Sequence, residues 1–408
     1  MGDRQEEAVW AVSCRGHRAA MRCRSGEPGL LYHSEKSAVA NPHYRRTRVR
    51  LLCIPLDFDQ NFRQIPARRA IGPVAPRDHF VLTKTFQPSG ELIADRRADY
   101  ARMLAENGEL TAAIELMHQA LDIAPNWAGG WAMLGDYAEK AGDVSGAISA
   151  WRHLEALDDE GIFGAALKLA AHGAGSAADG TAVSYVEALF DQYAPQFETA
   201  LVQRLGYQVP ERLDDLLIEE MVRLGISSFS QALDLGCGTG LMGERLRHKV
   251  SVLEGIDLSA AMIAETARKG IYDRLEKAEL VAFLRERLAA NDLVTAADVF
   301  IYCGALAPVL AAVVPAMQPG GLLAFSLEAH QGEEPVFLRP SLRYAHGVDA
   351  TRQALVDAGL EVLRFEMATL RQDRGEPITG MLIVARKPPL ALVAANEVLP
   401  ADDGGVAA

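Results

Sequence analysis

Residues Gln231 to Gly240 (QALDLGCGTG) combine an acid with three alternating glycines, a pattern that points to a small-molecule binding loop. An apolar strand leads into Asp234, Gly236, Gly238 and Gly240, and a helical stretch follows. Glycines at this spacing let the backbone turn tightly and approach a ligand where any Cβ would collide. Dinucleotide folds use G-x-G-x-x-G to hold a pyrophosphate at a helix N-terminus, and the acid here would repel that group. A carboxylate can instead bind the ammonium of an amino-acid-like ligand, directly or through water.

A second apolar segment, Ser251 to Asp257 (SVLEGID), also ends in an acid, seventeen residues past Gly240. A carboxylate at the end of a second strand accepts hydrogen bonds from both ribose hydroxyls of a bound nucleoside. Leu258 and Met262 follow it and are predicted to flank an adenine face. Together the two motifs predict a single cofactor site.

The motifs DLGCGTG and GIDLS at this spacing resemble those of the class I S-adenosylmethionine-dependent methyltransferases. The resemblance implies S-adenosyl-L-methionine as cofactor, with its methionine and sugar cradled by the loop that includes Cys237 and its ribose held by the second-strand acid. Lys277 to Leu284 resembles the third strand of the family and the turn after it, where Glu279 is implied near the adenine amino group. Asp292 to Leu306 and Gln318 to Glu328 resemble the segments around the fourth and fifth strands.

Alternating apolar strands and amphipathic helices run from Tyr185 to about Lys387, which predicts a mostly parallel sheet with helices on both faces. The resemblance makes residues 181–387 an α/β, Rossmann-like class I methyltransferase domain. Tyr185 to Pro210 resembles the lid helices of small-molecule methyltransferases of the ubiquinone and biotin-pathway type. Within it, Tyr193 is a candidate substrate-binding residue; the alternative is that it belongs to the helix core.

Residues 89–172 precede this domain and contain a 34-residue repeat. Small and large residues recur at equivalent positions: Gly108 and Gly142, Ala113 and Ala147, and Met117 and Trp151. Such positions let two helices pack closely, so α-helical hairpins are expected. The pattern resembles the tetratricopeptide repeat (TPR), and the whole arrangement is similar to a bacterial group of TPR-containing methyltransferases. Two alternatives stay open for these helices: they present a groove to a protein partner, or they cap the next domain.

Residues 1–88 hold fifteen basic and eight acidic side chains and show weak periodicity, which predicts a disordered basic leader. One alternative is a basic arm that contacts nucleic acid or anionic lipid. Another is sequence upstream of the true start, because chains of the resembling group commonly begin near the equivalent of Val81 or Phe86. Residues 172–181 are predicted to form a flexible hinge and residues 388–408 a flexible tail.

The formal charge of −13 over 408 residues disfavours general binding to nucleic acid or to anionic membranes. The uncharged stretch Val299 to Leu327 is long enough to cross a bilayer, but Pro308, Pro315 and Pro319 interrupt it, so a buried α/β core is predicted instead. Five scattered cysteines without a C-x-x-C pair favour a reducing cytoplasm. No set of His, Asp and Glu has metal-ligand spacing, so no metal is predicted.

Candidate residues for the methyl acceptor lie beyond the fifth strand, in sequence predicted to be loop. Glu328, His330, Arg343, Tyr344 and His346 gather there, and a helix is predicted from about Asp349. The candidate catalytic residues are His346, Tyr344 and His330, since a histidine could act as general base, and Arg343 could clamp a carboxylate substrate bidentately. The alternative is a packed, hydrogen-bonded loop. Cys303 is predicted to be a small buried residue and not a nucleophile.

Methyl transfer from a sulfonium is an in-line displacement, so few residues need to be catalytic. The resemblance favours a methyltransferase that acts on a small molecule or a carrier-bound acyl group, with oxygen as the acceptor atom. YCGA stands where base and amide methyltransferases carry D-P-P-Y or N-P-P-Y, so base methylation is not supported. The alternatives are a TPR interaction scaffold with a cofactor-binding but non-catalytic domain, and a protein methyltransferase.

Overall fold

The computed structural model describes residues 9–14, 17–22, 88–176, 183–194, 197–198, 206–373 and 375–390. The chain divides into two compact units, Met1–Pro73 and Val74–Ala408. In the first unit, β1 (Val9–Cys14) and β2 (His17–Arg22) form an antiparallel hairpin, which the sequence analysis does not predict. The rest of the predicted leader up to residue 87, residues 177–181 of the predicted hinge, and residues 391–408 lie outside the described residues.

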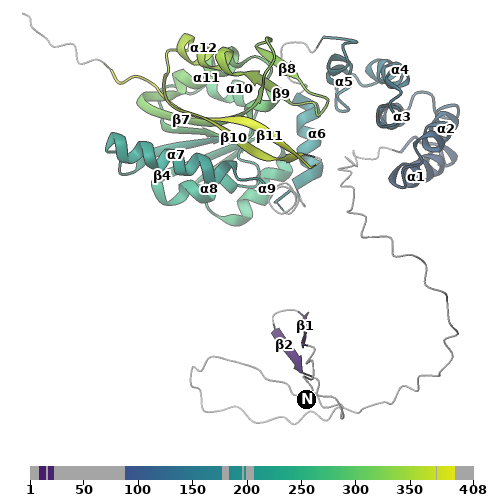
Figure 1. Cartoon of the computed structure of the whole chain (residues 1–408), viewed down its shortest axis with the longest axis horizontal. Helices are drawn as coiled ribbons and strands as arrows, with labels where there is room; N and C mark the ends of the chain where they lie inside the picture. The colour runs from purple at the N-terminus through teal and green to yellow at the C-terminus, as the bar shows by residue number, and fades with distance from the viewer. Residues whose placement is uncertain are drawn as a thin grey trace, which may run out of the picture. The chain divides into compact units, whose positions relative to one another are not determined.

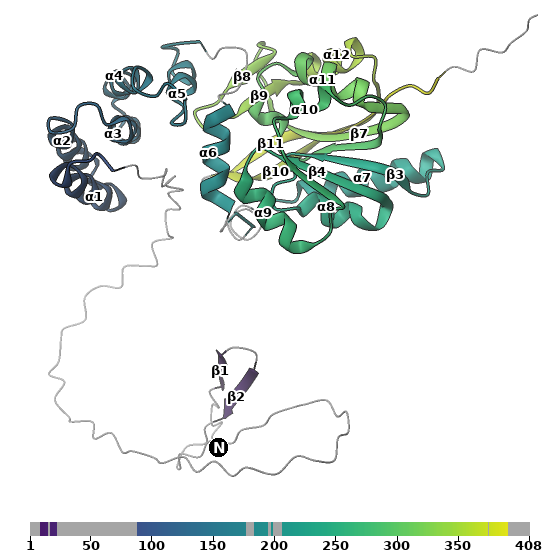
Figure 2. The same ribbon diagram turned by 180° about the vertical axis from the view of Figure 1, so that it is seen from behind.

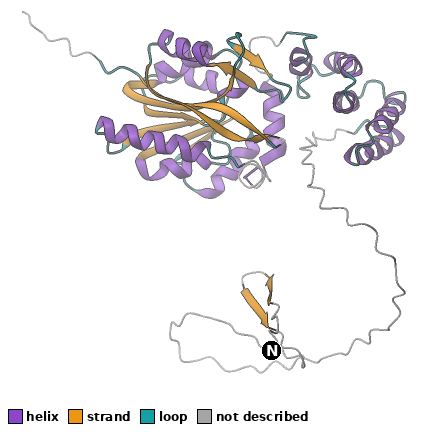
Figure 3. Cartoon of the chain, in the orientation of Figure 1, coloured by secondary structure: helices purple, strands orange, loops and turns teal. Residues whose placement is uncertain are grey.

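The second unit begins with five helices in the region of the 34-residue repeat (Figure 3). They are α1 (Leu92–Glu106), α2 (Leu110–Leu121), α3 (Ala128–Ala141), α4 (Val144–Glu155) and α5 (Ala165–Ala171). The repeated glycines, Gly108 and Gly142, both adopt positive φ just after a helix, where a left-handed residue ends it. A Cβ at Gly135 of α3 would collide with the indole of Trp151 of α4, so these two helices pack closely at this glycine.

A seven-stranded path forms the main sheet, in the order β10-β11-β7-β6-β3-β4-β5. The strands are β3 (Phe229–Leu235), β4 (Val250–Asp257), β5 (Arg274–Lys277), β6 (Asn291–Ala296), β7 (Met317–His330), β10 (Glu361–Asp373) and β11 (Glu376–Arg386). The pairs within β5-β4-β3-β6-β7 are parallel, whereas β11 is antiparallel to both β7 and β10. The predicted mostly parallel sheet is therefore confirmed.

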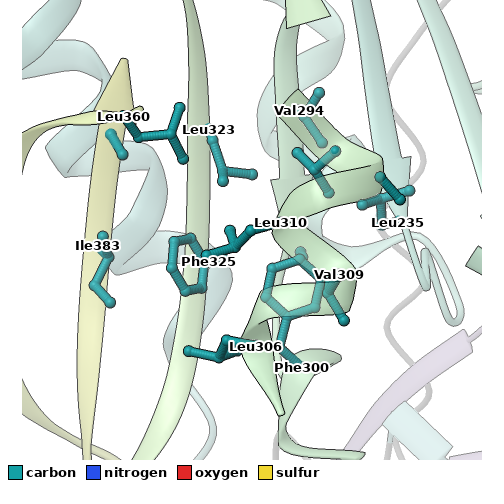
Figure 4. Close-up of a cluster of buried hydrophobic side chains, with 14 of the residues drawn as sticks. Leu235, Val294, Phe300, Leu306, Val309, Leu310, Leu323, Phe325, Leu360 and Ile383 are labelled. Carbon is teal, nitrogen blue, oxygen red and sulfur yellow. The ribbon is translucent and has the colours of Figure 1, made fainter. Parts of the chain in front are cut away.

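Helices cover both faces of this sheet (Figures 1 and 2). One face packs against α7 (Val209–Leu224) and α8 (Leu241–Leu246), and the other against α10 (Leu280–Arg285), α11 (Leu306–Ala316) and α12 (Val348–Asp357). Figure 4 shows the second of these cores, in which Phe300 and Phe325 pack beside Leu310 and Val309. The uncharged stretch that starts at Val299 thus forms a short 3-10 helix, α11 and β7 inside this core, as predicted.

Strand order makes the carboxyl ends of β3 and β6 the point at which the chain changes direction across the sheet. β3 and β6 are neighbours in the sheet. From β3 the chain goes on to β4 on one side, and from β6 it goes on to β7 on the other side. In open α/β sheets, ligands bind at such a switch point. Two short strands extend the sheet here: β9 (Tyr344–Gly347) pairs with the end of β7, and β8 (Val336–Leu338) pairs with β9. Helix α6 (Val183–Tyr193) and α9 (Ala260–Lys269) lie at the same end.

Candidate active site

The loop between β3 and α8 is built from glycines that no other residue could replace without strain. Gly236, Gly238 and Gly240 all have positive φ, at 59°, 55° and 89°. A Cβ at Gly236 would lie 2.5 Å from a methyl group of Val299, so this glycine is required by packing. Gly238 differs, because the nearest described atom to its Cβ position is on Phe197, 3.9 Å away. The backbone of Gly238 is therefore open to close approach by a ligand.

Asp257 ends β4 beside this loop, where the sequence analysis expects it. Its Oδ2 accepts a hydrogen bond from the Gly238 N–H at 2.8 Å, and its Oδ1 accepts one from the Ser259 N–H at 2.8 Å. Burial raises the pKa of Asp257 to about 6, against the opposing effect of these N–H donors. Each carboxylate oxygen can accept a further hydrogen bond. The residue can thus hold the loop and two ligand hydroxyls at the same time.

Asp234 lies directly below the loop and is 1% exposed. Its Oδ2 accepts a hydrogen bond from the Tyr272 hydroxyl at 2.6 Å, and its Oδ1 accepts one from the Thr295 hydroxyl at 2.7 Å. Burial raises the pKa of Asp234 to about 6, and both hydroxyls act in the opposite direction. Sequence analysis misses Tyr272 and Thr295, since neither stands within a motif.

The remaining predicted cofactor residues take different places. Cys237 is 5% exposed, and burial raises the pKa of its thiol well above the usual value, so it is a packed, neutral residue of the loop. Met262 is fully buried, whereas Leu258 is partly exposed beside the cluster around Tyr185. Glu279 follows β5 at the same sheet edge, and its carboxylate accepts hydrogen bonds from the backbone N–H groups of residues 281 and 282 at the start of α10.

Helix α6 is fastened to the cofactor loop region by polar contacts that the sequence does not reveal. Asp191 accepts hydrogen bonds from the Ser259 hydroxyl and, at 3.1 Å, from the Ala261 N–H. Glu187, one turn earlier, forms an ion pair with Lys277 at 2.6 Å. The predicted lid helix is therefore linked to Asp257 through Ser259, which bonds to both Asp191 and Asp257.

A row of aromatic rings connects the glycine loop with the predicted acceptor residues. Phe197, which faces Gly238, packs edge-on against Phe190 at 5.9 Å between centroids, and Phe190 packs edge-on against Tyr302 at 5.4 Å. Tyr302 forms a side-chain hydrogen bond with Arg343. Tyr193 is close enough to Tyr302 and Arg343 to interact electrostatically with both, and burial raises the pKa of its phenol. The structure thus brings the predicted substrate residues Tyr193 and Arg343 together.

Arginines and acids surround Arg343. Glu328 is fully buried and forms ion pairs with Arg339 at 3.0 Å and with Arg371, while Arg343 lies 3.8 Å from Glu328 and 3.4 Å from Asp373. The sequence analysis places Glu328 in a loop, which is wrong, because β7 extends to residue 330 and pairs there with β9. Glu328 is thus the buried countercharge of the arginine cluster.

The candidate catalytic residues also lie on strands and not in a loop. Tyr344 and His346 belong to β9, and His330 is the last residue of β7. Tyr344 is buried against Tyr185, with its ring 3.5 Å from the Cβ position of Gly304. His330 accepts a hydrogen bond from the backbone N–H of residue 332 through its Nδ1. The predicted loop is thus a strand pair that closes the acceptor side of the sheet.

His346 is 1% exposed, and burial lowers the pKa of its imidazole to about 4. Its Nε2 is 2.9 Å from the carbonyl oxygen of Gly304, and because a carbonyl only accepts, Nε2 carries the proton. Nδ1 is buried and has no hydrogen-bond partner among the described residues. Cys303, the preceding neighbour of Gly304, has a thiol pKa raised by burial to about 12, which agrees with the prediction that it is not a nucleophile.

The part of the chain that the structure describes contains no group of three or more His, Cys, Asp or Glu side chains that could hold a metal ion. In those same residues no helix has the length and apolar character needed to cross a membrane.

Comparisons with known proteins identify this chain as similar to methyltransferases. A family described as methyltransferase domain matches residues 233–323. Malonyl-[acyl-carrier protein] O-methyltransferase of Enterobacter lignolyticus is 30% identical over 192 residues, which are 45% of this chain and 70% of that protein. Trans-aconitate 2-methyltransferase of Pseudomonas paraeruginosa is 34% identical over 110 residues, 26% of this chain and 39% of that protein. The magnesium protoporphyrin IX methyltransferase of Synechocystis, solved with S-adenosylhomocysteine, shows 17% identity and a TM-score of 0.40 over 50% of this chain and 99% of that one.

The sheet order, the open glycine loop and the acid at the end of β4 define a nucleoside-binding α/β domain, and its sequence relatives are methyltransferases. The chain belongs to the S-adenosylmethionine-dependent methyltransferases. The site fits this cofactor, because Gly238 leaves room where a Cβ would intrude and both oxygens of Asp257 keep the capacity for another hydrogen bond. When bound, the cofactor supplies an electrophilic methyl group on a sulfonium.

Proposed function

We propose that this methyltransferase transfers the methyl group to an oxygen atom of a carboxylic acid, either a small molecule or an acyl group on a carrier. The observation that carries this proposal is the cluster of Arg339, Arg343 and Arg371 beside the aromatic row that starts at the glycine loop. A guanidinium binds a carboxylate through two parallel hydrogen bonds. Relatives named for malonyl-carrier and trans-aconitate methylation support an acidic acceptor.

Arg343 is the arginine best suited to bind the acceptor. Its two acidic neighbours are 3.8 Å and 3.4 Å away, so neither forms a short ion pair with it. Arg371, by contrast, is 3% exposed and is held between Glu328 and Asp298. Arg371 therefore neutralises Glu328. Arg343 can give up its long contacts with Glu328 and Asp373 and form an ion pair with a substrate carboxylate instead.

We assign cofactor binding to the two motifs found in the sequence. Gly236, Gly238 and Gly240 line the methionine and sugar, Asp257 binds the ribose, and Asp234 attracts the methionine ammonium from below. Leu258 and Glu279 stand at the adenine end. Because Met262 and Cys237 are buried, we propose that they support the site without touching the adenine.

The acceptor decides whether a base is needed. A carboxylate oxygen is already a nucleophile at neutral pH and loses no proton during methyl transfer. A hydroxyl acceptor must release one, and Nδ1 of His346 is then the proposed acceptor of that proton, with Tyr344 and His330 beside it. The chemistry of the arginine cluster favours the carboxylate.

Helices α1–α4 provide the structural basis for a second proposal, a protein partner. They form the helix pairs expected of two TPR-like units, with Trp151 packed against Gly135. A carrier protein or a protein substrate would bind there, in the reducing cytoplasm that the scattered cysteines favour. Deleting residues 1–172 separates the roles, since a small free acid should still be methylated while a carrier-bound or protein substrate should not.

Turnover with a panel of acceptors tests the main proposal. The full chain is incubated with methyl-labelled S-adenosylmethionine and matched acids, their amides and their alcohols, free and thioester-linked. Label in base-labile methyl esters of the acids alone is the expected result. Label in amides or alcohols, with none in acids, would contradict the choice of a carboxylate oxygen.

A further inference from the structure

Tyr272 lies beneath the glycine loop in a space that three glycines leave for it. A Cβ at Gly243 would collide with its hydroxyl, and Cβ atoms at Gly255 and Gly240 would lie 2.7 and 3.3 Å from its ring. These glycines come from α8, from β4 and from the residue just before α8. The ring is therefore held from three directions, which fixes where its hydroxyl points.

The hydroxyl of Tyr272 points at the buried acid of the first motif. It donates to Oδ2 of Asp234 at 2.6 Å, while the Thr295 hydroxyl donates to Oδ1 at 2.7 Å from the neighbouring strand β6. Each carboxylate oxygen thus receives one proton donor and keeps one free direction. With both oxygens held, the carboxylate cannot rotate away from the loop above it.

We propose that Tyr272 and Thr295 are positioning residues that hold the Asp234 carboxylate ionised and oriented for the ammonium group of the bound cofactor. This inference rests on the role proposed above for Asp234. It adds two residues to the site from outside both sequence motifs, one from the connection between α9 and β5 and one from the end of β6.

The charges around Asp234 explain why two hydroxyl donors are needed. Burial and the nearby carboxylate of Asp257 both favour the neutral acid, and the hydrogen bonds from Tyr272 and Thr295 favour the ionised one. The other titratable groups near Asp234 are the thiol of Cys237 and the phenol of Tyr207, both of which stay neutral because burial raises their pKa values well above normal. The pKa of Tyr272 is also raised well above normal by burial, so it remains a donor.

With a pKa of about 6, Asp234 is ionised at pH 7. Loss of either hydroxyl removes a contribution that lowers this pKa, so the acid becomes neutral over part of the neutral range. Each unit of pKa above the working pH then costs about tenfold in affinity for a cationic group. The loss of affinity relative to the unmodified protein is therefore largest near and below pH 6 and disappears once the pH exceeds the pKa of the acid in the variant.

The test is the affinity of the full-length protein for S-adenosylhomocysteine, measured by calorimetry from pH 5.5 to 9 with Tyr272→Phe. We expect the variant to bind about tenfold more weakly near pH 7, with the ratio of the two dissociation constants largest at pH 5.5 and approaching one toward pH 9. Titration of the ligand's own amine cancels in this ratio. A ratio that stays constant with pH, or no weakening at pH 7, would overturn the proposal, since a packing defect alone does not titrate.

Variants of Thr295 provide an independent test of the same proposal if Tyr272→Phe folds poorly. Thr295→Val removes the hydroxyl with little change of shape and should reproduce the pH-dependent loss, whereas Thr295→Ser keeps the hydroxyl and should restore binding. Tyr137→Phe, at a buried tyrosine of α3, is the matched control and should leave the ratio near one at every pH. Because binding is measured without an acceptor, an error in the proposed acceptor class cannot mimic failure here.

Discussion

The backbone N–H of Gly238 donates a hydrogen bond to Oδ2 of Asp257 over 2.8 Å. A second bond, from the Cys237 N–H to the carbonyl of Ile256 at 2.9 Å, runs beside it. The loop after β3 and the end of β4 are therefore joined as one rigid unit. Both motifs recognised in the sequence belong to this unit, and the open face of Gly238 is the side that we propose meets the cofactor.

The first prediction concerns the open face of Gly238. Gly238→Ala should fold, since the added Cβ lies 3.9 Å from the nearest described atom, with a cost of about 1 kcal/mol for the left-handed backbone. The same Cβ occupies the space that a ligand needs, so affinity for S-adenosylmethionine should fall at least about a hundredfold. Calorimetry and thermal unfolding measure the two effects separately.

Gly142→Ala is the matched control for this substitution. Gly142 also has positive φ, at 81°, and nothing described lies within 4 Å of its Cβ position, but it ends α3 in the helical region. It should show a similar loss of stability and unchanged cofactor affinity. Equal affinity losses in both variants would mean that Gly238 is not at the cofactor.

The second prediction concerns the ligand-free protein. As pH rises, the free energy of unfolding of Asp234→Asn should increase relative to that of the unmodified protein. The pKa of Asp234 is about 6 when folded and 3.8 in the reference state, so the folded protein holds the extra proton between these values. Ionising the buried acid therefore destabilises the native state as pH rises from 4 to 6, and the full cost applies above 6. The amide does not titrate, so the stability difference should move in favour of the variant by about 1 to 3 kcal/mol between pH 4 and pH 8.

Denaturant unfolding at the two pH values measures this difference, and cofactor binding by the same variant should be weakened. Asn can keep both neighbours, because its amide oxygen still accepts from one hydroxyl while the other hydroxyl rotates to accept from its amide N–H. A stability difference that is equal at pH 4 and pH 8 would show that Asp234 titrates normally in the folded protein.

The cofactor motifs were predictable because they are local in sequence. Strand, turn and helix around Gly236 to Gly240 follow one another directly, and Asp257 ends the next strand. Tyr272, Thr295 and Asp191 were not predictable, because each reaches the site only through tertiary packing, at 38, 61 and 68 residues from its hydrogen-bond partner.

The acceptor side shows a different kind of error. SLRYAHG was predicted to be a loop, since it is short and lacks clear alternation, yet Tyr344–Gly347 forms β9. Its hydrogen bonds depend on the end of β7 and on β8, which no local pattern in the segment can report. Hydrophobic periodicity therefore cannot predict a short strand that is stabilised by its neighbours. Sequence motifs nevertheless singled out Tyr344 and His346 within it as candidate residues.

The third prediction tests the contact between α6 and the cofactor site. Asp191→Ala removes the acceptor for the Ser259 hydroxyl and the Ala261 N–H, so α6 should detach more often. We expect dissociation of S-adenosylhomocysteine to accelerate by about three- to tenfold, because one charge-assisted contact is lost. Stopped-flow displacement measures this rate. Asp215→Ala, at an exposed position of α7, should leave the rate unchanged, and a similar rate in both variants would argue against a lid role for α6.

The fourth prediction addresses the arginine proposed to bind the acceptor. Arg343→Gln should raise KM for an acidic acceptor by about ten- to a hundredfold and leave cofactor affinity within about twofold, because a bidentate ion pair is lost only on the acceptor side. Arg343→Lys keeps the charge but not the paired geometry and should recover only part of the loss. Arg96→Gln, on the exposed face of α1, serves as control. An unchanged KM in Arg343→Gln would remove this residue from the acceptor site.

The fifth prediction uses His346 to distinguish between acceptor chemistries. With its pKa lowered to about 4, the imidazole is neutral at every pH above 5, and its Nδ1 is available to take a proton. If the acceptor is a hydroxyl, His346→Gln should lower kcat about a hundredfold or more. If it is a carboxylate, kcat should change little, since no proton leaves the acceptor.

The pH dependence of the free energy of unfolding shows whether the His346 imidazole is held neutral in the folded protein, when the unmodified protein is compared with His346→Gln. The folded pKa of His346 lies below the unfolded value of 6.5, so the unfolded chain binds the extra proton between pH 4 and 6.5. This group therefore destabilises the native state progressively as pH falls through that window, by up to about 3 kcal/mol. Relative to His346→Gln, the unmodified protein should lose stability from pH 6.5 to pH 4. A parallel pH dependence in both proteins would mean that the imidazole is not held neutral, and its assignment as the available base would fail with it.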